Sequence, residues 1–263
     1  ACVVAGSWTS RYLTWSVAEE YPDKEFWFFD EPIEGVSNVY SMSYNANEGS
    51  CLAGMAAASV SESGVIGFIG GEDSTVVNDS LVGYLEGAAY VNPYIKAIVS
   101  YTGNWDDSAK GKELALVQYN AGADVVFQLA SNAGVGVFEA AKETGKLAIG
   151  SDTDQSLIFA ESDPDKAAAI LTSSLKRVDT SLLRAYELYK QGQVPYGTCE
   201  KLGLDKECVG IVENDFFKAH VSEEDAAAIA QAKQDIIDGK ITVSSSYGMT
   251  TEELAAFKAQ YIK

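Results

Sequence analysis

Short apolar runs alternate with longer amphipathic segments through the first 156 residues. Each apolar run has the length of a buried strand, and each segment between has apolar residues at helical spacing. The predicted strands are 1–7, 25–30, 65–71, 97–103, 124–130 and 146–152, and the predicted helices are 10–22, 48–61, 74–93, 107–123 and 132–145. This alternation of six strands with five helices predicts a parallel sheet with helices on both faces, a doubly wound α/β architecture.

The rhythm changes after residue 156. We expect a strand leading into a helix over 167–192, a hairpin over 194–215, an acidic helix over 222–239, a strand over 240–245 and a last helix from Thr251. No Pro/Ser-rich linker separates two domains. A two-lobed arrangement would therefore need the chain to cross between lobes more than once.

Composition narrows the classes of partner. The 263 residues carry a formal net charge of −19, which argues against nucleic acid or an anionic membrane as partner because both attract basic patches. No apolar run approaches the roughly 20 residues that span a bilayer. The chain opens directly on an apparent strand, ACVVAGS, so we expect that upstream sequence is missing. The segment IGFIGGED has neither the dinucleotide-binding nor the P-loop spacing.

The four cysteines leave two interpretations open. Cys199 and Cys208 flank a short polar segment and are candidates for a disulfide, which would indicate an oxidising compartment. The alternative is two reduced thiols. Cys2 and Cys51 lie in apolar contexts that are typical of core residues. Because no CxxC pattern is present and the chain has one histidine, we expect no structural zinc site.

Ligands of open parallel sheets bind beyond the carboxyl ends of the strands, so the residues there are the candidate site. They are polar or aromatic and include no histidine or lysine, and therefore no nucleophile–base pair. This inventory favours a neutral ligand with hydroxyl groups and an aromatic face over catalysis or a cofactor. The residues are Ser7, Trp8, Asp30, 71–73, Asn104, Trp105, Ser131, Asn132 and Asp152.

Two acids follow the strand 146–152 in the stretch LAIGSDTDQS. We do not expect Asp152 and Asp154 to converge on one proton or metal ion. No DxDxDG calcium loop follows. Asp152 can accept hydrogen bonds from a vicinal diol, as in sugar and nucleoside recognition. Asp154 is predicted to cap the next turn.

Two further residues have alternative interpretations. Phe127 could stack on a flat ring or belong to the core, as most strand phenylalanines do. Lys176, at a strand-to-helix junction, could be a donor beside Asp152 or a solvated lysine.

Several segments together resemble the basic membrane protein family, purine-nucleoside-receptor-like lipoproteins that deliver ligand to ABC importers. They cover most of residues 1–192 in order, and the closing KQDIIDGKITV is also similar. The matching stretches are YPDKEFWFFD, NANEGSCLAGMAAA, GVIGFIGGED, DSAKGKELALVQYNAGADVVFQLASNAGVGVFEAAKETG, AIGSDTDQS and ILTSSLKRVD.

The resemblance implies a type I periplasmic-binding-protein fold of two doubly wound parallel-sheet lobes that enclose the ligand. It implies that lobe one holds 1–62 and about 175–193, without its first strand and helix. Lobe two would hold 63–174 and about 194–250, with a C-terminal helix at 251–263. It further implies an extracytoplasmic protein, lipid-anchored or periplasmic, that is monomeric, has no cofactor or enzymatic activity, and docks on an ABC transporter permease.

The resemblance also assigns roles within a purine-nucleoside site. Asp152 and Lys176 would hold the ribose hydroxyls, Phe127 would stack on the base, and Asp30 would accept from a base edge. Asn132 would also bind the ligand, but it stands where the family has a glycine of its AGG loop, and this departure puts the family's backbone contact there in doubt. Asn47 and Glu48 are expected to start a helix. Trp8 and Trp105 remain candidates from the residues alone.

The chain departs from the family at its start, because nothing matches the family's first strand and its D-x-[SG]-F-N loop, which contacts the base. The alternatives are a binding protein for a sugar or a furanose-like ligand, and a nucleoside-processing enzyme, which would need an acidic metal cluster. A transcriptional regulator of the same fold would need a basic DNA-binding segment, and none is present.

Overall fold

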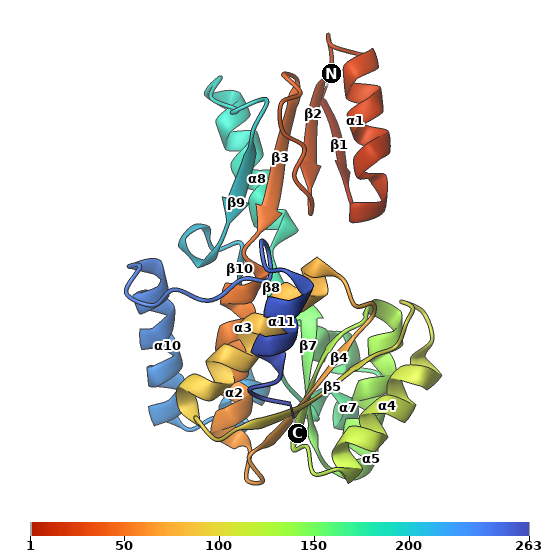
Figure 1. The fold of residues 1–263 in the computed structure, drawn as a ribbon, viewed down its shortest axis with the longest axis vertical. Helices are drawn as coiled ribbons and strands as arrows, with labels where there is room; N and C mark the ends of the chain where they lie inside the picture. Colours follow the sequence, from red (N-terminus) through yellow and green to blue (C-terminus); the bar gives the residue numbers. More distant parts are fainter. Residues whose placement is uncertain (1, 263) are drawn as a thin grey trace. The chain divides into compact units, whose positions relative to one another are not determined.

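The computed structural model describes residues 2–262, with all side chains except that of Trp8. The chain divides into two compact units (Figure 1). The first unit comprises Ala1–Asn45 and Arg177–Val209, and the second comprises Ala46–Lys176 and Gly210–Lys263. Both are built on parallel sheets, so the predicted α/β class with two lobes is confirmed.

The first unit contains a four-stranded parallel sheet in the order β1-β2-β3-β9. Phe26 and Phe28 of β2 are buried against Ala18 of the first long helix, which explains why EFWFF is apolar almost throughout. The strands are β1 (Cys2–Gly6), β2 (Glu25–Phe29), β3 (Val39–Tyr44) and β9 (Cys199–Leu202), and the helices are η1 (Trp8–Ser10), α1 (Arg11–Glu20), α8 (Val178–Lys190) and η3 (Leu204–Lys206).

The second unit contains a six-stranded sheet in the order β10-β8-β7-β6-β4-β5. The strands from β8 to β5 are all paired in parallel. Its strands are β4 (Val65–Gly70), β5 (Lys96–Tyr101), β6 (Val125–Leu129), β7 (Leu147–Asp152), β8 (Ile170–Lys176) and β10 (Val209–Ile211). Its helices are α2 (Ala46–Val60), α3 (Thr75–Val91), α4 (Ser108–Asn120), η2 (Ser131–Gly134), α5 (Val135–Thr144), α6 (Gln155–Phe159), α7 (Pro164–Ala168), α9 (Asp215–His220), α10 (Glu223–Ile237) and α11 (Thr251–Lys258).

Helices α2 and α3 pack with their backbones almost in contact. A Cβ atom added to Gly87 would lie 1.9 Å from the carbonyl oxygen of Cys51, and one added to Gly54 would lie 2.0 Å from that of Tyr84. The small residues of GSCLAGMAAA are therefore required by this close crossing. As a result α2 belongs to the second unit, and the boundary falls after Asn45 instead of near residue 62.

The expected hairpin over 194–215 is wrong. Its two strands lie in different sheets, since β9 pairs in parallel with β3 and β10 lies beside β8. Residues 194–209 therefore fall within the first unit, whereas the expectation placed them in lobe two. The helix from Thr251 falls within the second unit.

The expected strand over 240–245 is also wrong, because its backbone finds side-chain partners instead of a neighbouring strand. The Asn47 side chain donates to the carbonyl groups of Val243 and Ser244. Glu86 accepts from the amide of Ser244, and Asp79 accepts from that of Ser246. We call residues 243–246 the C-terminal strap. The structural role expected for Asn47, at the start of α2, is confirmed.

The chain beyond the strap closes the edge of the second sheet. The Ala97 amide of edge strand β5 donates to the carbonyl of Tyr261 at 2.8 Å. A short parallel bridge joins Ala97 to Ile262. Over residues 2–262, no helix is long and apolar enough to cross a membrane.

Candidate functional site

Backbone strain is concentrated at the carboxyl ends of the strands. Among the described non-glycine residues, positive φ angles occur at Ser7 (112°), Asp30 (89°), Ser131 (52°), Asp152 (66°) and Glu207 (55°). All but Glu207 end or closely follow a strand that the sequence marked as ligand-facing. This conformation costs an L-residue about 1–2 kcal/mol, and such strain is often kept at functional sites.

Asp152 and Lys176 lie side by side at the ends of neighbouring strands. In the register of β7 and β8, Asp152 is opposite Leu175. The Nζ atom of Lys176 is 3.5 Å from Oδ1 of Asp152, and the side chains remain 32% and 52% exposed. The carboxylate can accept hydrogen bonds from two adjacent hydroxyls, and the ammonium group beside it can donate to their oxygens. The two residues that the sequence pointed to are therefore brought together.

A tight turn presents Asp152. The amide of Thr153 donates to the carbonyl of Ser151 at 2.8 Å, which makes Asp152 the central residue of a three-residue turn with φ at 66°. As a consequence, the side chain of Asp152 does not follow the alternating side-chain directions of β7.

Asp154 has a different role, as expected. Its Oδ1 atom accepts from the amides of Ser156 and Leu157 at the start of α6, and its Oδ2 atom accepts from the side chain of Asn214. It is therefore a helix cap. The part of the chain that the structure describes holds no group of three or more His, Cys, Asp or Glu residues that could bind a metal ion.

Trp105 and Asn132 lie on loops that contact each other. The Trp105 ring packs closely on Gly71: a Cβ atom added to Gly71 would lie 2.5 Å from the indole ring. The carbonyl of Trp105 accepts from the amide of Ala133, and the Asn132 side chain donates to Asp106 at 3.2 Å. The indole nitrogen of Trp105 is buried and has no hydrogen-bond partner among the described residues. The loops after β4, β5 and β6 therefore form one connected surface.

Phe127 does not have the position that stacking would require. Its side chain is fully buried in β6, with ring centroids 5.4 Å from Phe68 and 5.2 Å from Tyr84. The ring is enclosed by these aromatic neighbours and leaves no face for a ligand. The alternative interpretation, a core phenylalanine, is the correct one.

Asp30 and Trp8 belong to the first unit. Asp30 follows β2, is partly buried and donates its amide hydrogen to the carbonyl of Met42 at 3.0 Å. Trp8 begins the short helix η1, but its side chain lies outside the described residues. The contact of Asp30 with a base edge and the stacking of Trp8 on a base or sugar remain predictions.

The candidate disulfide is absent, and both cysteines are thiols. Cys199 lies in β9 with its sulfur 3.4 Å from the hydroxyl of Ser43. Cys208 is buried after the left-handed residue Glu207, and its thiol donates to the carbonyl of Lys206. Burial raises the pKa of the Cys208 thiol to about 11. Each sulfur thus has its own partner, Ser43 of β3 for Cys199 and the loop carbonyl of Lys206 for Cys208.

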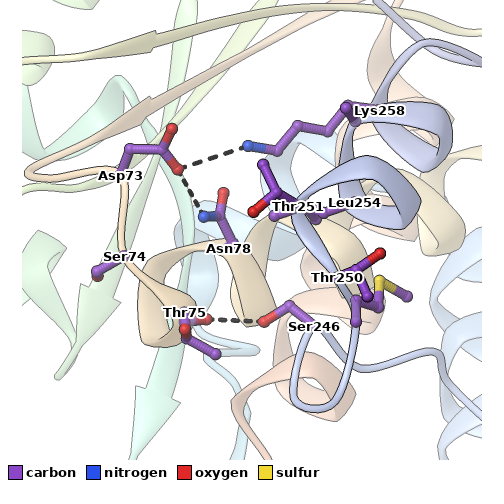
Figure 2. A pocket seen from close by; sticks show the side chains of 11 residues that line it. Asp73, Ser74, Thr75, Asn78, Ser246, Thr250, Thr251, Leu254 and Lys258 are labelled. Carbon is purple, nitrogen blue, oxygen red and sulfur yellow. Dashed lines mark hydrogen bonds and ion pairs between the residues drawn. The ribbon is translucent and has the colours of Figure 1, made fainter.

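A polar pocket of about 410 Å³ lies between the start of α3 and α11 (Figure 2). Lys258 of α11 places Nζ 3.7 Å from Asp73 and donates to the Tyr101 hydroxyl at 3.0 Å. Asn78 donates to Asp73 at 2.6 Å and accepts from Tyr101. Burial lowers the pKa of Lys258, against the opposing effect of Asp73. Asp73, a strand-end residue, thus fastens α11, and no sequence motif marks Lys258 as its partner.

Two parallel-sheet units with strained, polar strand ends are the features of an α/β solute-binding protein. Residues 9–246 match the Bmp family, described as ABC transporter substrate-binding protein PnrA-like. The chain belongs to this family.

Two named relatives agree with this assignment. The nucleoside-binding ABC transporter protein BmpA of Lactococcus lactis subsp. cremoris is 37% identical over 88% of this chain and 68% of its own length. The CD4+ T-cell-stimulating antigen of Listeria monocytogenes is 33% identical over 86% of this chain and 65% of its own length. The chain thus spans about two thirds of these relatives.

The solved structure of an ABC transporter solute-binding protein from Aeropyrum pernix K1 has the same fold, with a TM-score of 0.81. The match covers 99% of this chain and 83% of the Aeropyrum chain, at 23% sequence identity.

Proposed function

We propose that this protein binds a purine nucleoside as the extracytoplasmic substrate-binding component of an ABC importer. The observation that carries the proposal is the Asp152–Lys176 pair, whose carboxylate and ammonium groups lie 3.5 Å apart at the ends of β7 and β8. This pair has the chemistry to hold the 2′- and 3′-hydroxyls of a ribose. The 37% identity to a nucleoside-binding relative supports the choice of ligand class.

Other candidate residues extend this assignment. Trp105 and Asn132 lie on the connected loops of the second unit and would contact the rest of the nucleoside. Asp30 would accept a hydrogen bond from the base. The membrane permease of the importer would be the protein partner, and attachment by a lipid stays a prediction.

A binding protein for a free sugar is the second candidate. The only ligand contact that the Asp152–Lys176 pair specifies is with a vicinal diol, which sugars and nucleosides share. The base therefore distinguishes a nucleoside ligand from a free sugar, so the assay has to compare ligands with and without a base.

The test is calorimetric titration with adenosine, guanosine, inosine and ribose. We expect nucleosides to bind and Asp152→Asn to weaken binding about 100-fold, because a hydrogen bond to a charged group contributes about 1.5–3 kcal/mol. Asp154→Asn is the matched control, since asparagine is also a good helix cap and affinity should not change. Ribose binding without nucleoside binding would replace the proposal with the sugar candidate. Unchanged affinity in Asp152→Asn would place the diol contact elsewhere.

A further inference from the structure

Two glutamines, Gln128 fully buried and Gln155 partly buried, form a hydrogen-bond network with Ser151, the residue before Asp152. The Nε2 atom of Gln128 donates to Oε1 of Gln155 at 2.6 Å and to Oγ of Ser151 at 3.2 Å. Oε1 of Gln155 also accepts from the amide of Ser151 at 3.0 Å, and the amide of Gln155 donates to Oγ of Ser173 at 3.2 Å. Gln128, Ser151 and Ser173 stand on the neighbouring strands β6, β7 and β8.

The network has a single consistent orientation. Both Nε2 hydrogens of Gln128 are used, and its Oε1 atom accepts from the amide of Ala130 at 3.1 Å. Rotating this side-chain amide by 180° would place donors against donors. Gln128 and Ser173 are fully buried and Ser151 nearly so. A buried network whose members are paired in this way holds the attached backbone rigidly.

The backbone that the network holds consists of two strained turns. On one side, Gln155 bonds the amide of Ser151, the residue before Asp152 with its φ of 66°. On the other side, Gln128 bonds the amide of Ala130, the residue before Ser131 with its φ of 52°. An added Cβ on neighbouring Gly134 would lie 1.8 Å from Gln128 Oε1, so the loop 130–134 rests directly on this amide.

We propose that Gln128 and Gln155 are positioning residues that hold Asp152 and the loop 130–134 together in the ligand-binding geometry. The proposal rests on the proposed function, because Asp152 is its diol-binding group. Neither glutamine was a candidate from the sequence. The signal in hindsight is a glutamine inside the otherwise apolar strand VVFQL, where only a fully paired amide is tolerated.

The chain offers a matched control in Gln118 of α4. This glutamine is also fully buried, and its Nε2 atom donates to the carbonyl of Phe68 at 3.0 Å and to Ser100 Oγ at 3.2 Å. It bonds residues inside β4 and β5, and neither strained turn. Gln118→Met therefore reports the general effect of removing a buried amide.

The decisive variants are Gln155→Met, which keeps the length of the side chain and removes the acceptor, and Gln155→Glu, which keeps an oxygen acceptor. In the ligand-free protein, hydrogen exchange of the Ser151 and Ala130 amides should be at least about tenfold faster in Gln155→Met. It should be near wild type in Gln155→Glu and in Gln118→Met. Unchanged exchange in Gln155→Met, or equal acceleration at these amides in Gln118→Met, would overturn the proposal.

Binding gives the second readout. Gln155→Met should lower affinity for inosine about tenfold and reduce the preference for inosine over 2′,3′-dideoxyinosine, a preference that general destabilisation would not alter. In an Asp152→Asn background the same change should have little further effect. An unaltered preference would overturn the proposal while leaving the proposed function standing. If the wild-type protein binds no nucleoside, the proposed function fails, and hydrogen exchange alone decides whether the network holds the two turns.

Discussion

Replacing Asp152 separately by glycine and by alanine measures the strain stored at the candidate site. Both substitutions remove the carboxylate, and with it the pairing to Lys176 at 3.5 Å. That pair is partly exposed and contributes about 0–1 kcal/mol, an amount lost equally in both variants. The difference between the variants therefore reports the backbone alone.

The magnitude follows from the φ angle of 66°. Alanine in this left-handed conformation costs about 1–2 kcal/mol, whereas glycine adopts it freely. Glycine also gives the unfolded chain more entropy, which reduces its advantage by about 0.4–1 kcal/mol. Asp152→Gly should therefore be more stable than Asp152→Ala by about 0.5–1 kcal/mol, although both should lose nucleoside binding.

The assay is thermal and urea unfolding of the two variants side by side, followed by circular dichroism and by Trp fluorescence. For a unit of this size, the difference corresponds to about 1–4 °C in melting temperature. The reasoning is refuted if the alanine variant is at least as stable as the glycine variant, because Asp152 would then not be held in a strained conformation.

Three further outcomes are expected. Burial acts to raise the pKa of Asp124, but hydrogen bonds from Lys146 and two serines outweigh it and lower the pKa from 3.8 to about 2. Asp124→Asn should therefore be less stable than the wild type by about 1–2 kcal/mol at pH 7. In urea titrations this difference in unfolding free energy should vanish as the pH falls from about 4 to about 2. Gly87→Ala should destabilise by about 1–2 kcal/mol in the same assay because α2 and α3 must separate, whereas Gly210→Ala, which meets no atom within 4 Å, should not. A thiol reagent should react with four thiols in the denatured protein and leave Cys208 unmodified in the native one. Reaction with two thiols in the denatured protein would instead indicate that Cys199 and Cys208 form a disulfide.

The sequence predicts well where a signal is local. The strands 65–71, 97–103, 124–130 and 146–152 are found within a residue or two as β4 to β7, since each is a short apolar run followed by a turn signal. The approach of Lys176 to Asp152 was predictable for the same reason, because both stand at the ends of parallel strands. Asp154 was recognisable as a cap from the polar residues after it.

The errors share a dependence on distant partners. Residues 240–245 have the composition of a strand, but their hydrogen bonds are made with Asn47, Asp79 and Glu86, on helices far away in the sequence. The role of Phe127 depends on whether Phe68 and Tyr84 enclose it, which its own strand cannot indicate. Gln128 and Gln155 are likewise ordinary residues until the sheet brings them within 2.6 Å.

The division of the chain at residues 45–46, 176–177 and 209–210 determines the order in which the protein can assemble during synthesis. The first sheet cannot be completed when its first three strands leave the ribosome, because β9 is made only after β4 to β8 of the other unit. We expect the inserted strands to form their sheet while β1 to β3 still lack that neighbour. The edge of β3 is then an unpaired strand edge that the nascent chain has to protect until residue 202 emerges.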